Sequence, residues 1–323
     1  MENKKLHVLF VSSGNSKNGI TPIVKAQAES LSENGVNIDF FTINGNGLTG
    51  YIANIKPLRN KLRNSKIDII HSHYSFSSFV ASLANIGLKI PQITSLMGSD
   101  VNEKGLWKFL IKMFNGLFWK AVIVKSDDMK NKISIKCDIH VIPNGVNFEH
   151  FPYLDKENAQ GIAGFDKSKK NIIWVSNPQR PEKNYSLAKS AVEDLKNNEI
   201  KLNIVSDIAH EDIYKYMYSA DLLLLTSLWE GSPNVVKEAM ACNLPVVSTD
   251  VGDVRYLFGN EPGYYISSDK PKEMANTIKE VLKFNRINEK TNGKERLNRL
   301  DLDSISIANR IKLLYNSCIR DII

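Results

Sequence analysis

The sequence predicts an α/β protein with two domains, each built around a parallel sheet covered by helices. The chain has 323 residues, which is more than one typical core accommodates and about right for two ordinary domains. Short, continuous apolar runs alternate with longer helical patterns, as in a series of βαβ units. The clearest unit lies between Asp221 and Val254, where a buried strand, an acidic turn, a helix and a second buried strand follow one another.

The composition is that of a soluble globular protein whose positive charge is concentrated in the first half. Hydrophobic residues make up 42% of the chain and charged residues 24%. Residues 1–160 carry 19 Lys and Arg against 13 Asp and Glu, which is +6 of the total net charge of +7. Such a field attracts an anionic membrane surface, a phosphorylated acceptor or nucleic acid. No nucleic-acid partner is expected, because the usual binding motifs are absent from the sequence.

A cytoplasmic location is expected from the start of the chain and from its apolar runs. The N-terminus is polar and leads directly into a strand, and no apolar run is long enough for a signal segment or a transmembrane helix. Peripheral attachment to the inner face of a membrane stays open as an extension of this expectation. The three cysteines, Cys137, Cys242 and Cys318, are widely spaced and odd in number, so buried free thiols are expected rather than disulfides or metal ligands.

The first domain is expected over residues 1–154. Its strands are expected at residues 7–12, 36–43, 67–71, 92–95 and 121–125, and its helices at residues 21–34, 51–66 and 104–120. A polar loop bounded by Gly14 and Gly19 joins the first strand to the first helix. The helix at residues 51–66 carries a row of basic side chains: Lys56, Arg59, Lys61, Arg63 and Lys66.

The helix at residues 104–120 allows two interpretations. At 100° per residue, Lys104, Lys108, Lys112 and Asn115 fall on one narrow face, and nearly all the aromatic side chains lie opposite. A helix of this kind rests on a membrane surface when its apolar face is free. Alternatively, that face packs on the sheet, as helices of a doubly wound fold do. Both interpretations stay open at this level.

The second domain is expected over residues 171–303, after a polar linker at residues 155–170. Its strands are expected at residues 171–176, 201–205, 221–227 and 245–249, and its helices at residues 185–197, 211–219 and 234–242. Asn243 tolerates the left-handed conformation that ends the helix at 234–242, and Pro245 prevents its continuation. A last helix is expected at residues 304–321.

The turn at residues 228–234 has the features of a phosphate site. Ser232 is a good N-cap, Pro233 suits the first helical position, and Gly231 permits an unusual backbone angle. The chain is therefore expected to turn tightly into a helix. In open α/β sheets ligands bind at the carboxyl ends of strands, and the N–H groups at helix N-termini attract phosphate.

Two carboxylates, Glu230 and Glu238, accompany this predicted phosphate site. Carboxylates are unusual in a site that binds only an anion. They suit a ligand that also carries hydroxyl groups, because an ionised carboxylate accepts hydrogen bonds from a sugar or a ribose. A nucleotide-sugar combines phosphates with both kinds of hydroxyl.

Residues 230–242, Glu-Gly-Ser-Pro-Asn-Val-Val-Lys-Glu-Ala-Met-Ala-Cys, resemble the E-x7-E signature of retaining glycosyltransferases of the GT-B fold, the family 4-like group. Asp221 and Ser227 before the signature, and Pro245 after it, extend the match. Residues 142–147, Ile-Pro-Asn-Gly-Val-Asn, are similar to the turn that ends the first domain of this family. The resemblance implies two Rossmann-like domains facing across a cleft, with the helix at residues 304–323 crossing back onto the first.

The resemblance also implies roles for residues of the second domain. Glu230 orients the transferred sugar, and Glu238 binds ribose hydroxyls. The remaining donor-binding residues of this turn are Gly231, Ser232, Pro233, Asn234 and Val235. Lys183 matches the family lysine that holds the donor diphosphate. The family arginine stands five residues before that lysine, where this chain has Pro178, so Arg180 is expected to do the same work from three residues before.

In the first domain the resemblance implies that Gly19 lies near the donor phosphates when the domains close. His73 is expected to help shape the acceptor pocket, with a purely structural histidine as the alternative. Residues 96–100, Leu-Met-Gly-Ser-Asp, are similar to a His-Gly-x-Asp motif of the family. Met97 stands at the position of the histidine, so the role of that imidazole is not expected here.

The implied function is retaining transfer of a hexose-type sugar from a nucleoside-diphosphate sugar to a hydroxyl of a glycan or lipid-linked acceptor. Synthesis of a surface polysaccharide or glycolipid is the expected setting, and no cofactor beyond the co-substrate is expected. No metal is expected either, because helix capping explains the Asp301-Leu302-Asp303 pattern. A nucleotide-sugar epimerase of the same fold and a non-catalytic nucleotide-sugar-binding protein remain as alternatives.

Overall fold

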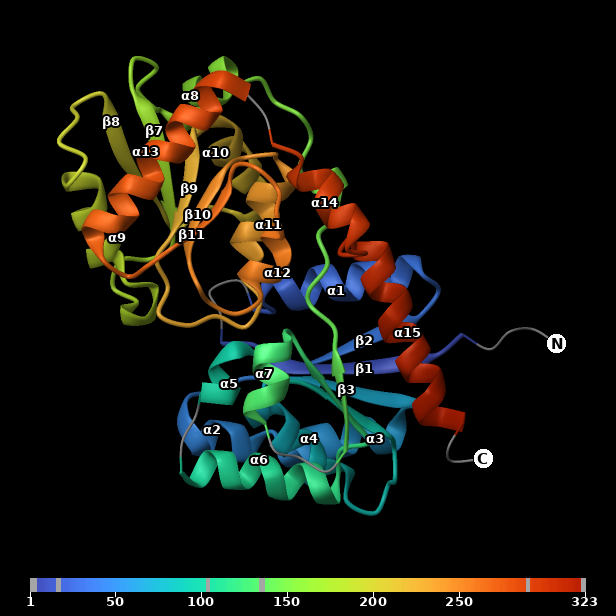
Figure 1. Ribbon diagram of the computed structural model, residues 1–323. Coiled ribbons are helices and arrows are strands. Elements are labelled where there is room, and N and C mark those ends of the chain that lie inside the picture. The colour runs from blue at the N-terminus through green and yellow to red at the C-terminus, as the bar shows by residue number, and fades with distance from the viewer. Residues whose placement is uncertain (1–4, 16–18, 103–104, 134–136, 289–290, 321–323) are drawn as a thin grey trace. The chain divides into compact units, whose positions relative to one another are not determined.

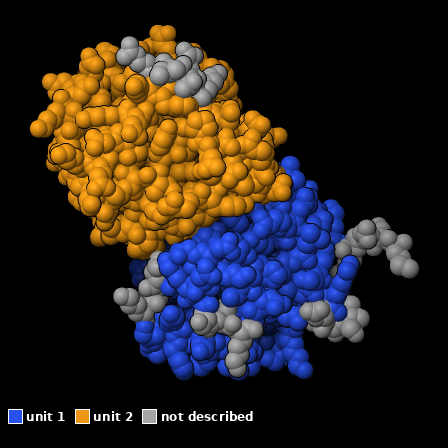
Figure 2. Space-filling model, in the orientation of Figure 1, with its two compact units in different colours: residues 1–145, 304–323 blue, residues 146–303 orange. Residues whose placement is uncertain are grey.

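The computed structural model describes residues 5–15, 19–102, 105–133, 137–288 and 291–320. The chain forms two compact units, shown in different colours in Figure 2. Unit 1 consists of residues 1–145 and 304–323, and unit 2 of residues 146–303. Each unit holds one parallel sheet, so the predicted α/β class with two Rossmann-like domains is confirmed.

Unit 1 contains a six-stranded sheet in the order β2-β1-β3-β4-β5-β6, and every neighbouring pair of strands is parallel. Its strands are β1 (His7–Ser13), β2 (Asn37–Ile43), β3 (Ile69–His73), β4 (Gln92–Ser95), β5 (Ala121–Val124) and β6 (Asp138–Val141). Every residue of β3, β4 and β5 is buried, as expected when helices cover both faces of a parallel sheet.

The helices of unit 1 are α1 (Pro22–Glu33), α2 (Gly47–Ala53), α3 (Ile55–Asn64), α4 (Ser75–Asn85), α5 (Gly98–Asn102), α6 (Leu106–Leu117), α7 (Asp127–Lys132) and α15 (Ser304–Arg320). Figure 1 shows α1 and α15 on one face of the sheet and α3, α4 and α6 on the other. Tyr315 of α15 is fully buried and bonds His71 of β3, with 2.6 Å between Oη and Nδ1. The helix α15 is thus part of the core of unit 1.

The single helix predicted at residues 51–66 is wrong, because the chain forms two helices that meet at Asn54. Pro57 lacks an N–H, and its ring would clash with the carbonyl of the residue four positions earlier in a continuous helix. A new helix that begins after Asn54 places Pro57 in its first turn, where no hydrogen-bond donor is needed. The Asn54 side chain donates to the carbonyls of Asn44 and Gly50, at 2.9 and 2.7 Å, which holds the break in place.

Unit 2 contains a five-stranded parallel sheet in the order β11-β10-β9-β7-β8. Its strands are β7 (Lys170–Val175), β8 (Ile200–Val205), β9 (Leu222–Leu225), β10 (Val246–Thr249) and β11 (Tyr264–Ser267). Trp174, Leu222, Leu224 and Val247 anchor its core, against which Ile278 of a long helix packs. The sequence analysis placed the first four strands within two residues of their ends and did not predict β11.

The helices of unit 2 are α8 (Lys156–Ala163), α9 (Tyr185–Glu193), α10 (Ile213–Ser219), α11 (Asn234–Ala241), α12 (Val254–Phe258), α13 (Pro271–Asn288) and α14 (Gly293–Arg299). The unit also contains the short 3-10 helices η1 (Phe148–His150), η2 (Pro181–Lys183) and η3 (His210–Asp212). The chain enters and leaves unit 2 at neighbouring residues, because Val146 forms a β-bridge with Asp303.

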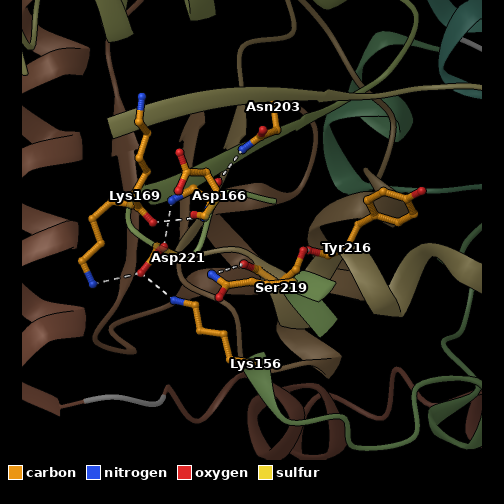
Figure 3. A network of polar contacts seen from close by, with 10 residues as sticks. Lys156, Asp166, Lys169, Asn203, Tyr216, Ser219 and Asp221 are labelled. Carbon is orange, nitrogen blue, oxygen red and sulfur yellow. Dashed lines mark hydrogen bonds and ion pairs between the residues drawn. The ribbon is translucent and has the colours of Figure 1, made fainter. Parts of the chain in front are cut away.

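The linker expected at residues 155–170 is instead a folded part of unit 2. Asp155 caps α8 by accepting the Asn158 N–H, and Gly164 ends the helix in the left-handed conformation. The helix is then tied to the sheet through Asp221, which is 1% exposed and accepts from Lys156 Nζ at 2.7 Å (Figure 3). The Asp221 carboxylate also accepts the backbone N–H of Asn171 at the start of β7. Asp221 therefore anchors the end of the sheet opposite to the loop that carries Glu230.

Candidate functional site

Three loops of unit 2 meet at the carboxyl ends of β7, β9 and β10, which are neighbours in the parallel sheet. Hydrogen bonds fasten these loops to one another. The Leu228 N–H donates to the Glu182 carbonyl at 2.9 Å, and the Thr226 hydroxyl donates to the Lys183 carbonyl at 2.9 Å. The Thr249 hydroxyl donates to the Ser227 carbonyl at 2.7 Å. The loops therefore form one platform around the start of α11.

Glu230 is held at the centre of this platform by a lysine and a serine. Its Oε1 accepts from Lys183 Nζ at 2.5 Å and from Ser227 Oγ at 2.7 Å. The side chains of Glu230 and Lys183 are only 14% and 17% exposed. Two residues predicted from sequence are thus brought together, and Ser227, which the sequence analysis used only as a flanking match, is their direct partner.

Arg180 is not brought to the same point. Its guanidinium pairs with Glu182 of its own loop, at 2.6 Å from Nη2 to Oε1, and the side chain is 55% exposed. The cation of this loop that contacts Glu230 is therefore Lys183, while Arg180 lies at the solvent side of the loop. Sequence spacing alone did not separate the two, because both follow the same strand.

The helix α11 begins at Asn234, as the sequence predicts, but its N-terminal cap differs from the prediction. Pro233 is the N-cap residue, and the Ser232 hydroxyl makes no capping bond, so the predicted roles of Ser232 and Pro233 are wrong by one position. Gly252 has φ +57° and packs on Gly231 so closely that a Cβ there would lie 2.6 Å from the Gly231 carbonyl oxygen. This contact holds the turn after β10 against the first turn of α11. The predicted ends of the helix are otherwise confirmed, with Asn243 at φ +54°.

Glu238 lies in the second turn of α11 with its side chain 11% exposed. Its Oε1 is 2.9 Å from Nε2 of His210, which belongs to η3 after β8. The hydrogen bond that His210 donates to Glu238 raises the pKa of His210, and the nearby Glu211 adds to this effect. The sequence analysis did not single out His210, because no local pattern links a residue after β8 to one in α11.

A buried pair of opposite charges lies behind the same turn. Lys237 is fully buried, and burial lowers its pKa to about 8. Asp253 is 8% exposed, and burial raises its pKa to about 6, although the positive charge of Lys237 acts against this. The Ser232 hydroxyl lies beside the Asp253 carboxylate and, like Lys237, favours its ionised form. The sequence analysis did not predict that either side chain is buried. In the sequence Lys237 is one of the polar residues of an amphipathic helix.

In unit 1 His73 lies inside the core instead of at a pocket. It is 3% exposed, its ring stacks on His71 at 4.4 Å, and burial lowers its pKa to about 3. A neutral, enclosed imidazole favours the alternative that His73 is a purely structural histidine. Gly19 has φ +76°, and open space surrounds the position of a Cβ. Residues 16–18 of the Gly14–Gly19 loop lie outside the described residues.

Asp100, at the end of the motif that contains Met97, has a structural role. Its two carboxylate oxygens accept backbone N–H groups, from Ser75 at 3.0 Å and from Met97 at 2.6 Å. The carboxylate thereby joins the turn after β3 to the turn after β4. The motif thus organises two loop backbones at the carboxyl end of the unit 1 sheet.

Within the described residues, no group of three or more His, Cys, Asp or Glu side chains is arranged to hold a metal ion. Across the same part of the chain, every helix is too short or too polar to cross a bilayer.

Two family models match the chain. The model described as Glycosyltransferase Family 4 matches residues 28–150, and the model described as Glycosyl transferases group 1 matches residues 205–283. The first match covers residues 28–145 of unit 1 and the first five residues of unit 2, and the second covers β9, α11 and the loops after β9 and β10. Both halves of the chain are therefore similar to glycosyltransferases.

A curated relative is the putative teichuronic acid biosynthesis glycosyltransferase TuaC of Bacillus subtilis. It is 28% identical over 244 residues, which are 68% of this chain and 62% of the relative. The match thus spans a little under two thirds of that protein.

Solved structures share the fold over nearly the whole chain. Sucrose-phosphate synthase from Thermosynechococcus elongatus has a TM-score of 0.85 at 16% identity, with 98% of this chain and 100% of that chain covered. Anabaena Alr3699/HepE, solved in complex with UDP and glucose, has a TM-score of 0.77 at 16% identity, with 97% and 100% covered. At such identities the likeness shows the architecture alone.

Proposed function

This chain belongs to the glycosyltransferases of the GT-B fold, and we propose that it transfers a hexose-type sugar, with retention, from a nucleoside-diphosphate sugar to a hydroxyl of a glycan or lipid-linked acceptor. The observation that carries the proposal is the platform of unit 2. It combines the N-terminus of α11, a cation and two separated carboxylates. These are the groups that phosphates, a sugar and a ribose require.

Each group has a distinct task in the proposed reaction. Lys183, and Arg180 once it leaves Glu182, neutralise the diphosphate as negative charge develops on it, and the residues from Gly231 to Val235 place the start of α11 beside it. Glu230 accepts from hydroxyls of the transferred sugar, and Glu238 from those of the ribose. Lys183 is paired with Glu230, so the cation for the diphosphate and the carboxylate for the sugar lie side by side.

In the proposed retaining step the bond between the sugar carbon and the diphosphate oxygen breaks, and the acceptor oxygen bonds to that carbon from the same face. The acceptor proton passes to the departing phosphate oxygen, so no additional base is required. Positioning and electrostatics then supply most of the rate. A UDP-sugar is the first donor to test, since the structurally similar Alr3699/HepE was solved with UDP and glucose.

Glu238→Ala tests the assignment of the nucleotide site. The variant is expected to weaken binding of the nucleoside diphosphate by about 1.5–3 kcal/mol, the range for hydrogen bonds to a charged group. Calorimetry with UDP, GDP and ADP on the wild type identifies the base, and the same titration of the variant measures the loss. Glu193→Ala, an exposed glutamate of α9, is the matched control.

Wild-type affinity in Glu238→Ala, with the fold intact, would remove Glu238 from the site. Turnover of a nucleotide-sugar without transfer to an acceptor would favour the epimerase alternative. Tight nucleotide binding without any turnover would favour the non-catalytic binding protein.

The proposal includes peripheral contact between unit 1 and an anionic membrane, through an apolar stripe on α6. Leu106, Phe109, Met113 and Leu117 recur every three or four residues along this helix, and their exposed fractions are 65%, 61%, 38% and 68%. Lys108 and Lys112 are exposed beside them, and residues 105–126 contain no Asp or Glu. Apolar insertion and attraction to anionic lipid therefore act on the same surface.

This stripe differs from the surface that the sequence indicated. Asn115 is 2% exposed and bonds Cys137, so the narrow polar face predicted for the helix is wrong, and Lys104 lies outside the described residues. Ile111 and Phe114 pack into the core of unit 1, so α6 is apolar on two faces. Arg59 of α3 donates to the carbonyls of Ala84 and Ile86, so its guanidinium is bound at the C-terminal end of α4.

Sedimentation with lipid vesicles tests the stripe. Phe109→Gln with Leu117→Gln is expected to reduce binding to anionic vesicles at least tenfold, because each fully buried apolar side chain contributes about 1.5–3 kcal/mol. Wild-type binding is expected to fall with added salt, since exposed charges are screened beyond roughly 8 Å at physiological ionic strength. Leu313→Gln on α15, where the side chain is 69% exposed, is the control. Equal sedimentation with neutral and anionic vesicles would contradict the contact and favour a soluble acceptor.

A further inference from the structure

The hydrogen bond between His210 and Glu238 joins two elements that are distant in sequence. Glu238 lies on α11, and His210 comes from η3, 28 residues earlier. Among the described residues His210 is the side chain that bonds the Glu238 carboxylate, at 2.9 Å from Nε2 to Oε1. A carboxylate is an acceptor, so Nε2 carries the proton of this bond.

We propose that His210 is a positioning residue for nucleotide binding, which holds one oxygen of Glu238 so that the carboxylate meets the ribose hydroxyls in a fixed orientation. The inference rests on the proposed function, because it takes Glu238 as the ribose-binding group. It adds a residue that neither the sequence motif nor the helix carrying Glu238 contains.

The Glu238 carboxylate can accept hydrogen bonds from His210 and from the ribose hydroxyls at the same time. An ionised carboxylate has about four lone-pair positions on its two oxygens, and His210 uses one of them. The others remain for a ribose diol, whose two hydroxyls both donate. His210 therefore stays in place when the nucleotide arrives and need not be displaced.

The benefit of His210 is the orientation that it imposes before binding. A glutamate side chain has several rotatable bonds, and a ligand that must immobilise it binds more weakly. His210 immobilises Glu238 in advance, from a side chain that is itself 41% exposed and lies at the rim of the site. Its loss is expected to weaken nucleotide binding about 2- to 12-fold, the equivalent of about 0.5–1.5 kcal/mol.

The neighbours of His210 supply a matched control. Glu211 follows it on η3 and contributes negative charge near the imidazole, and Asp212 is paired with Lys215 at 2.6 Å. Glu211→Ala therefore changes the local charge without touching the hydrogen bond to Glu238. Wild-type nucleotide affinity is expected in this variant.

Calorimetry on the full chain tests the proposal with three probes. These are the tightest binder among UDP, GDP and ADP, its 2′,3′-dideoxy analogue, and inorganic pyrophosphate. His210→Ala is expected to weaken the intact nucleotide about 2- to 12-fold and to leave the dideoxy analogue and pyrophosphate unchanged. His210→Gln is expected to restore most of the affinity, because its amide presents an N–H at the position of Nε2 and does not titrate.

The outcomes separate this inference from the proposed function. Wild-type affinity in His210→Ala, or equal weakening of all three probes, overturns the positioning role, and so does a His210→Gln variant as weak as His210→Ala. If Glu238→Ala weakens nucleotide binding in the same experiment, the proposed nucleotide site stands although His210 is excluded. If Glu238→Ala has no effect, or the wild type binds no nucleotide, the proposed site itself fails and the inference fails with it.

Discussion

Glu230→Ala is expected to lower turnover by about 100- to 1,000-fold, the usual result of removing one preorganised electrostatic group from a reaction centre. Affinity for the free nucleoside diphosphate is expected to stay at the wild-type level or to rise. The reason is that Lys183 is paired with Glu230, and without this partner its full charge faces the diphosphate. Steady-state transfer kinetics and calorimetry with the nucleoside diphosphate measure the two quantities separately.

Two comparisons make this prediction specific to Glu230. Glu193→Ala removes an exposed glutamate from α9 and is expected to change neither quantity. Ser227→Ala removes the second donor to Glu230 and is expected to lower turnover less than Glu230→Ala, since Lys183 remains in place. Wild-type turnover in Glu230→Ala would exclude this residue from the reaction centre.

Asp253→Asn is expected to remove a pH dependence of stability between about pH 4 and pH 6. Burial raises the pKa of Asp253 to about 6, well above that of an aspartate in the unfolded chain. In this interval the folded protein holds a proton that the unfolded chain has lost, so this group contributes stability at low pH that disappears as the pH rises through about 6. A pKa difference of about 2 corresponds to about 3 kcal/mol.

Denaturant unfolding at a series of pH values measures this contribution as the difference between wild type and variant. Relative to Asp253→Asn, the wild type is expected to lose about 3 kcal/mol between about pH 4 and just above pH 6. Asp250→Asn is the matched control, because Asp250 lies on the same turn but is exposed and pairs with Arg255. A constant difference between wild type and Asp253→Asn across this range would show that the carboxyl group is not buried as described.

The α/β class and the strand–helix–strand unit around Glu230 follow from the sequence because local patterns specify them. Four consecutive leucines form β9, and Asn243 with Pro245 ends α11 where predicted. The pairing of Lys183 with Glu230 was also foreseeable in part, because two residues that follow neighbouring parallel strands arrive at the same edge of the sheet. These features depend on periodicity, turn chemistry and the topology of βαβ units.

The predictions from sequence were wrong where a local pattern was compatible with two structures. Residues 155–170 are polar enough for a linker, yet α8 forms there, and the buried carboxylate of Asp221, just before β9, binds its Lys156. The helix expected at residues 51–66 breaks at Asn54, where Pro57 and the carbonyls of Asn44 and Gly50 together decide its end. In each case a partner distant in sequence changed the result.

The sequence by itself determined the fold class, the boundaries of the central strands and the presence of Glu230, Glu238 and Lys183 at one end of a sheet, because short-range periodicity and capping encode these features. Only the tertiary structure decided that His210 bonds Glu238, that Lys237 and Asp253 are buried together, and that His73 is enclosed. Whether a side chain is buried or hydrogen-bonded depends on segments that are distant in sequence and meet only in the folded protein. The order of residues along one helix or strand therefore does not reveal the free energy of these contacts.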